Sequence, residues 1–314
     1  MTTSTGTSTG TSTGTSTGNP ATPTRDWIVG VDGSDGSRHA ALWATAHARD
    51  RAERLRFVSA WHIPSAPALP PIGPMHKYWN IEAYEADARS AVEQLAGDLR
   101  SSSSVPIETS LVKGPVADVL IGAARHGSLL VVGSRGLGGF SRLVLGSTST
   151  QCATHAPVPV AVIPDVAPPD STDHIVVAFD GSQNSIDALA WTLDYAAPGT
   201  DIECVGVWDI APVAIGINQY YIPESNEAAQ DEFEGLVDRC LDDLGVERSA
   251  IRRSFVEGRT RQELATAARD ADMLVMGARG HGAVASHLLG SVSTWLLHHV
   301  ERPMVVVPHR SATS

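Results

Sequence analysis

The sequence predicts an α/β chain of two tandem domains, each a doubly wound, five-stranded parallel sheet with helices on both faces. Long blocks of sequence occur twice, about 144 to 148 residues apart. Short, unbroken apolar runs alternate with helical patterns inside each copy, as in parallel sheets that are buried on both sides. Hydrophobic residues make up 42% of the 314 residues, which is enough to bury two cores.

The internal repeat sets the domain organisation. WIVGVDGS at 27–34 returns as IVVAFDGS at 175–182, and LVVGSRG at 130–136 returns as LVMGARG at 274–280. Two copies of this length indicate two domains rather than a solenoid. We expect a disordered Thr/Ser/Gly tail over 1–24, which has nothing to bury. The first domain should then span 25–165, the linker 166–173 and the second domain 174–309.

Five apolar runs in the first copy are the strand candidates, and helical patterns lie between them. An Ala-rich stretch is expected to form the first helix, and apolar residues at helical spacing predict the next two. The third begins at Pro115 and stops before Gly127, where such residues belong. The expected strands are 27–31, 55–61, 107–112, 129–133 and 158–163, and the expected helices include 37–52, 80–100 and 115–126.

Charge and cysteine content exclude several classes of partner. The net charge is −12, about −2 over residues 25–173 and −10 from residue 174 onward. This acidic balance argues against a nucleic-acid partner and against binding to an anionic membrane. No apolar run approaches the roughly 20 residues of a membrane helix. Cys152, Cys204 and Cys240 have neither metal-ligand nor disulfide spacing, so we expect a cytoplasmic protein.

A glycine pattern follows the fourth strand of each copy. It reads G-x2-G-x9-G-[ST], from Gly133 and Gly136 to Gly146 and Ser147. Glycines let the backbone turn and approach a ligand closely, and the N-terminus of the helix that follows attracts phosphate. The pattern therefore predicts a phosphate-binding loop twice per chain. Its further members are Thr148 and Ser149, and in the second copy Gly277, Gly280, Gly290, Ser291, Val292 and Ser293.

Charged residues flank this loop in both copies. Arg135 and Arg279 lie inside it, where a guanidinium could reach the outer phosphates. Asp32 and Asp180 end the first strand of each copy and are followed by Gly-Ser. Each aspartate could bind a ribose or an adenine amino group, or it could belong to a helix N-terminus. Ser34 and Ser182 are expected to be helix caps.

With these residues in place, the chain resembles the ATP-binding class of the universal stress protein family, in the tandem form common among actinobacteria. The resemblance covers nearly all of 25–309. It implies two Rossmann-like (adenine nucleotide alpha hydrolase-like) domains, and two ATP molecules per chain, with Mg²⁺. It also implies that the last strands, 158–163 and 303–307, pair within one chain as a pseudo-dimer, which could itself form a homodimer. By this analogy, further lining residues are Gly30, Val31, Ala60 and Gly114 in the first copy, and Ala178, Phe179, Val207 and Gly258 in the second.

One departure from the family pattern lies in the second copy. Ala178 and Phe179 stand where the first copy has Gly30 and Val31. A pocket of different shape, or weaker binding, is therefore expected in the second domain.

Three functions remain open on the sequence alone. The first is a regulatory ATP-binding protein of the stress response with slow or no hydrolysis, the second is an ATPase or nucleotide-transferring enzyme, and the third is an interaction module with vestigial pockets. The chain has no Walker GxxxxGK[ST] loop, and its two lysines, Lys77 and Lys113, have no such setting. His281, His298 and His299 lie near the second loop, where we expect solvated side chains rather than a metal site or a general base.

Overall fold

A computed structural model of the chain describes residues 25–61, 81–136, 145–167, 169, 171–209, 225–280 and 288–309, leaving aside the side chains of 81–84. The expected tail at 1–24 lies outside these residues. None of the helices in the described part is long and apolar enough to cross a membrane.

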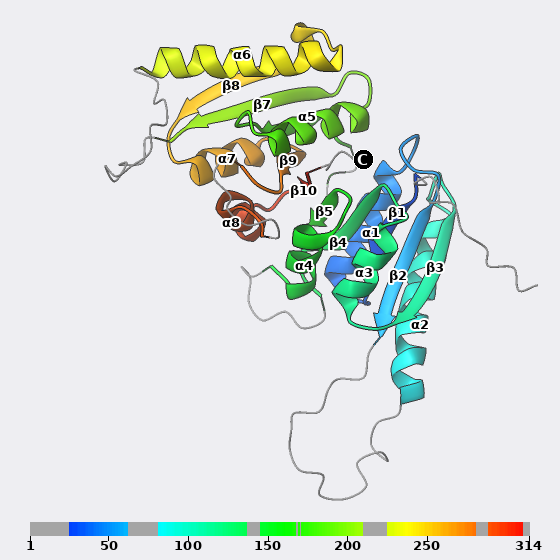
Figure 1. Cartoon of the computed structure of the whole chain (residues 1–314). Coiled ribbons are helices and arrows are strands. Elements are labelled where there is room, and N and C mark those ends of the chain that lie inside the picture. Colours follow the sequence, from blue (N-terminus) through cyan, green and yellow to red (C-terminus); the bar gives the residue numbers. More distant parts are fainter. Residues whose placement is uncertain are drawn as a thin grey trace, which may run out of the picture.

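The described strands form one continuous ten-stranded sheet in the order β3-β2-β1-β4-β5-β10-β9-β6-β7-β8 (Figure 1). Every pair inside a repeat is parallel, and the one junction between the repeats, β5 with β10, is antiparallel. The last strands therefore pair within one chain, as the resemblance implied. The strands are β1 Trp27–Gly30, β2 Leu55–Trp61, β3 Ile107–Lys113, β4 Leu129–Gly133, β5 Val160–Ile163, β6 His174–Ala178, β7 Asp201–Trp208, β8 Arg252–Glu257, β9 Met273–Gly277 and β10 Met304–Val307.

Helices cover both faces of this sheet. Helices α1, α2, α5 and α6 pack on one face, and α3, α4, α7 and α8 pack on the other. Each face has a single apolar core that runs through both repeats. The helices are α1 Asp35–His47, α2 Ile81–Arg100, α3 Val116–Ala124, α4 Ser147–His155, α5 Gln183–Tyr195, α6 Asn226–Leu244, α7 Thr260–Arg269 and α8 Ser291–His299; a short 3-10 turn lies at Arg248–Ala250.

Local sequence explains where these elements begin and end. Ser34 accepts a hydrogen bond from the Ser37 amide at 3.2 Å and caps α1, and Ser182 caps α5 in the same way, as predicted. Helix α1 ends at His47, earlier than predicted, because the chain turns at Asp50, whose φ is 63°. Strand β5 begins at Val160, after Pro159, which has no amide to donate to a neighbouring strand.

Aromatic side chains join the two repeats on the α1 and α5 side of the sheet. The Trp27 and Trp43 rings stack on Tyr195 of the second repeat, with centroids 6.3 and 6.5 Å away. The Arg51 guanidinium lies 4.5 Å above the same ring, and its Nε donates to the Tyr195 carbonyl at 2.7 Å. Stacking and cation–π contacts of this kind add to the burial of apolar area. The junction therefore has a packed core of its own beside the β5–β10 ladder.

The two repeats carry opposite charges at equivalent positions near the start of their strands. In the first repeat Arg54 binds Asp26 at 2.8 Å and Glu108 at 3.0 Å. The equivalent positions in the second repeat hold His174, Asp201 and Arg252, and Arg252 binds Asp201 at 2.8 Å. Each repeat thus has its own ion-pair network, and the signs are exchanged at the positions of Arg54 and Glu108.

The three cysteines provide a test of the packing. Burial raises the pKa of the Cys152 and Cys204 thiols to about 12 and raises that of Cys240 as well. At pH 8 only about one thiol in 10,000 with a pKa near 12 is a thiolate, so the folded protein should resist alkylation. We expect iodoacetamide to label none of the three at pH 8 within minutes, and all three in 8 M urea. Fast labelling of the folded chain would contradict this packing.

Candidate functional site

The predicted site residues meet at the carboxyl ends of the strands in each repeat. In the first repeat β1 lies between β2 and β4, and in the second β6 lies between β7 and β9. These are the points where the strand order reverses, and ligands of doubly wound sheets bind beside them. The strand-end positions are Gly30, Ala60, Gly114 and Gly133 in the first repeat, and Ala178, Val207, Gly258 and Gly277 in the second.

Gly133 is required by backbone packing. A Cβ atom on Gly133 would lie 2.5 Å from the carbonyl carbon and oxygen of Gly36, in the first turn of α1. A Cβ on Gly36 would in turn overlap the Arg135 carbonyl oxygen. The glycine pattern predicts that Gly133 leaves room for a ligand. The contact with Gly36 gives a second reason for a glycine at this position, because its absent side chain lets α1 approach the end of β4. This approach also fixes the course of the loop that follows β4.

Helix α4 begins without a side-chain cap. Its N-cap is Gly146, whose amide donates to the Ser134 carbonyl at 2.8 Å, and the side chain of Ser147 in the first turn is exposed. Helix α8 starts in the same way at Gly290 and Ser291. Helix N-termini carry unpaired amides and a partial positive charge that suit an anion. Both repeats therefore have an uncapped helix N-terminus at the place where the sequence predicted a phosphate loop.

The hydroxyl of the third helical residue is already used in both repeats. Ser149 is buried, and its Oγ donates to the Gly133 carbonyl at 2.7 Å. Ser293 donates to the Gly277 carbonyl at 3.2 Å. These serines fasten the helix to the end of its strand. The half-buried Thr148 and Val292 precede them, so a second hydroxyl is available in the first repeat alone.

Asp32 braces the turn between β1 and α1. Its Oδ1 accepts hydrogen bonds from the Ser34 amide at 3.0 Å and the Ser34 hydroxyl at 2.5 Å, while Ser34 is the helix cap. A Cβ on Gly136 would overlap Asp32 Oδ2, so this oxygen faces the loop that follows β4. Asp180 has the same relation to Ser182 and Gly280 in the second repeat. Each aspartate therefore supports the helix start and also lies beside the loop.

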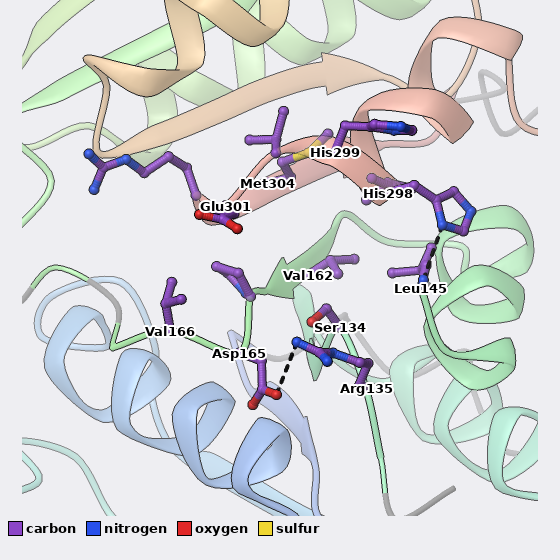
Figure 2. Close-up of a pocket in the computed structure, with 14 residues that line it drawn as sticks. Ser134, Arg135, Leu145, Val162, Asp165, Val166, His298, His299, Glu301 and Met304 are labelled. Atoms are coloured by element: carbon purple, nitrogen blue, oxygen red, sulfur yellow. Dashed lines mark hydrogen bonds and ion pairs between the residues drawn. The ribbon is translucent and has the colours of Figure 1, made fainter. Parts of the chain in front are cut away.

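Arg135 does not point where the sequence suggested. Its guanidinium forms an ion pair with Asp165 at 3.1 Å, at the junction of the repeats rather than over the helix end (Figure 2). The two side chains line a small hollow of about 80 Å³ together with Ser134, His298 and Glu301. Asp165 follows β5, and its position in the second repeat is held by His309, which pairs with Asp187 at 3.0 Å. Arg279 is half-buried and has no equivalent aspartate after β10.

His298 also differs from the expectation of a solvated side chain. Its Nδ1 accepts the amide proton of Leu145 in the first repeat at 3.1 Å (Figure 2). The contact forms because the antiparallel β5–β10 junction brings the end of α8 beside the start of α4. His299 is exposed and stacks on Trp295 with centroids 3.9 Å apart. His281 lies outside the described residues.

The second repeat differs from the first in the core beneath its site and in the charges around it. Phe179 is buried and packs edge-on against Phe233 at 6.2 Å, so its ring lies in the core under α6 and only its backbone borders the strand end. The second change is electrostatic. Glu257 and the half-buried Glu263 occupy the positions of Lys113 and Val119 in the first repeat, and the Glu263 carboxylate fills the space above Gly258.

Sequence reasoning missed four residues that shape the sites: Gly36, Asp165, Glu263 and the role of His298. Comparison of the repeats position by position contains a signal for Glu263, which replaces Val119, and for Asp165, which is replaced by His309. No local pattern signals Gly36 or the bond from His298, because both depend on contacts between distant segments. Among the residues that the structure describes, no group of three or more His, Cys, Asp or Glu side chains is placed to hold a metal ion.

Comparison with known proteins gives one consistent result. The profile of the universal stress protein family matches residues 24–164 and 171–308. A universal stress protein of Mycolicibacterium smegmatis is 33% identical over 297 residues, which cover 90% of this chain and 97% of that protein. The protein Rv1996 of Mycobacterium tuberculosis, a universal stress protein, is 28% identical over 89% of this chain and 93% of its own length. The crystal structure of a universal stress protein from Archaeoglobus fulgidus covers 91% of this chain and 99% of its own, with a TM-score of 0.66 and 18% identity.

The glycine contacts predict two opposite effects on stability. Gly133→Ala places a methyl group against the Gly36 backbone, which cannot move aside without shifting α1, and we expect a loss of about 3 kcal/mol. Gly122→Ala is the control, because nothing lies within 4 Å of its Cβ position on the exposed side of α3. It should stabilise the chain by about 0.5–1 kcal/mol. Urea unfolding measures both, and equal effects would contradict the packing described for Gly133.

Proposed function

The chain belongs to the universal stress protein family, and on that premise we propose that it is a regulatory nucleotide-binding protein with one ATP in each repeat. The observation that carries this proposal is the bare start of α4 and α8, each with a glycine N-cap at the strand-order reversal of its sheet. In α1 and α5 of the same chain, serine side chains cap the first turn. The starts of α3 and α7 also lack a side-chain cap, but α4 and α8 are the helices that begin at a glycine beside the predicted phosphate loops and leave their first amides to another partner.

The residues at this edge fit the parts of ATP in order. The first-turn amides of α4 and the exposed Ser147 hydroxyl would hold phosphate oxygens. Gly136 leaves the loop open on the side of Asp32, and Asp32 lies toward β1, where a ribose would follow. The strand-end backbone at Ala60 and at Gly114 lies farther along the same edge and would border the adenine. Gly280, Asp180 and Val207 offer the same order in the second repeat, where the Glu263 carboxylate lies over Gly258.

Magnesium would enter with the nucleotide. Mg²⁺ is usually held by one or two carboxylates together with phosphates and water, not by a full cage of side chains. Asp32 and Asp180 are the carboxylates beside the loops. Bound in this way, Mg²⁺ would neutralise part of the phosphate charge next to each aspartate.

We propose binding without rapid hydrolysis. A general base must be within hydrogen-bond reach of the attacking water, and catalysis of phosphate transfer also needs a cation on the outer phosphates. Asp32 is occupied by the Ser34 turn on one oxygen, and Arg135 is paired with Asp165 at the junction of the repeats. A regulatory role in a reducing cytoplasm is compatible with three cysteines that are free and buried.

The two sites should differ in affinity. The first repeat has Lys113 at the end of β3 and Val119 in α3, where the second has Glu257 at the end of β8 and Glu263 in α7. The second half of the chain also holds most of the negative charge. Like charges near ATP raise the cost of binding, and salt screens this effect over about 10 Å. We therefore propose that the first repeat holds the tighter site at low ionic strength.

The first test identifies the ligand and separates the sites. Mass spectrometry of material released from the denatured, freshly purified protein should detect ATP. Gly136→Glu adds a carboxylate beside Asp32, and Gly280→Glu adds one beside Asp180. In each case the new Cβ meets the carboxylate end of the aspartate, and only that end must move. Each should abolish binding in its own repeat, so that calorimetry with Mg-ATP shows about one site instead of two, with unfolding changed by less than about 1 kcal/mol. Released ADP would instead favour turnover. Absence of bound nucleotide, with unchanged titrations in both variants, would favour an interaction module.

The second test exchanges the charges. The double variant Glu257→Lys, Glu263→Val gives the second repeat the residues of the first. It should tighten ATP binding in the second repeat about threefold or more at 20 mM salt. The gain should shrink toward 500 mM salt because screening removes it. The measurement uses the Gly136→Glu background, in which only the second site binds. An effect that does not depend on salt would show that shape, not charge, distinguishes the sites.

A further inference from the structure

We propose that His298, in the second repeat, is a positioning residue for the nucleotide site of the first repeat; this inference rests on the proposed function. Its Nδ1 accepts the Leu145 amide proton at 3.1 Å across the junction (Figure 2). Leu145 is buried and directly precedes Gly146, the N-cap of α4. The second repeat therefore holds the chain at the point where the anion-binding helix end begins.

The bond from His298 completes a set of restraints on this helix end. From its own repeat, the start of α4 is held by the Gly146 amide on the Ser134 carbonyl at 2.8 Å, and by the Ser149 hydroxyl on the Gly133 carbonyl at 2.7 Å. These two contacts fix the distance of the helix from β4. The His298 contact acts one residue earlier and comes from the other repeat, so it adds a restraint on the direction in which the first-turn amides point.

A second contact at the junction restrains the other described part of the same loop. Arg135 pairs with Asp165 at 3.1 Å, and both side chains line the hollow whose opposite wall includes His298 and Glu301. The loop of the first repeat is therefore tied to the junction through Arg135 and through Leu145. A change in the position of α8 would therefore change the position of the residues at the start of α4.

The second repeat lacks the reciprocal restraint. The residue at the position of His298 in α4 is Thr154, and its hydroxyl donates to the Thr150 carbonyl in its own helix at 2.6 Å. The residue at the position of Asp165 is His309, which pairs with Asp187. The coupling is therefore directional, since the end of α8 supports the first site and nothing equivalent in α4 supports the second.

The chemistry of the bond defines the variants that test it. Since Nδ1 accepts, the imidazole carries its proton on Nε2, and the contact needs an acceptor at the Nδ1 position. His298→Ala removes the acceptor. His298→Asn places its amide oxygen near the Nδ1 position, whereas His298→Gln places it near the Nε2 position and is the matched control.

Mg-ATP titration in the Gly280→Glu background measures the first site alone. His298→Ala and His298→Gln should weaken its affinity about threefold to tenfold, the effect of one lost hydrogen bond, and His298→Asn should restore it. In the Gly136→Glu background none of the three should change the second site. Unchanged first-site affinity in His298→Ala, equal losses at both sites, or no rescue by asparagine would overturn the proposal.

A readout without nucleotide separates this inference from the proposed function. Amide hydrogen exchange at Leu145 should be slow in the unmodified chain, faster in His298→Ala and His298→Gln, and slow again in His298→Asn. If the unmodified chain bound no ATP while exchange followed this order, the proposed function would fail and the restraint on α4 would stand. If the amide exchange rate at Leu145 were the same with every residue at position 298, the proposed restraint on α4 would be refuted.

Discussion

The antiparallel pairing of β5 with β10 is the interaction on which the rest of the structure depends. Both strands are four residues long and almost completely buried, with Val305 opposite Ala161 at the centre of the ladder. In a separated repeat either strand would be an apolar edge with unpaired backbone groups on one side, and such an edge aggregates. Pairing removes both edges and lets one core on each face run through the whole chain. The two candidate sites therefore lie on one continuous sheet.

This junction also decides how the sites can influence each other. The ladder brings the end of α8 beside the start of α4, while stacking of Trp43 and Tyr195 closes the opposite face of the sheet. Contacts on both faces restrain rotation of one repeat against the other. Among the contacts described between the repeats, the His298–Leu145 bond lies beside the predicted phosphate loop of the first repeat, and the Arg135–Asp165 pair lies next to it within that repeat.

The repeats have diverged in charge while keeping their geometry. The Arg54 network and the Arg252 network exchange signs at two equivalent positions, and His309 replaces the acidic Asp165 after the last strand of the second repeat. Each exchange preserves an ion pair inside its own repeat, so it leaves the fold unchanged and alters the field around each site. Because contacts such as Arg51 on Tyr195 have no equivalent in the reversed direction, the two repeats are no longer interchangeable.

The sequence by itself determined the class of fold, the number of repeats, the strands of the first repeat and the place of the glycine loops, because these follow from local patterns. Unbroken apolar runs predict buried parallel strands, and Ser34 caps its helix through atoms three residues away. Only the tertiary structure decided why Gly133 must be a glycine, where Arg135 points and what His298 binds. Gly133 meets Gly36, nearly a hundred residues earlier, and His298 meets Leu145 in the other repeat. Such contacts arise from the packing of segments far apart in the chain, and no spacing within either segment encodes them.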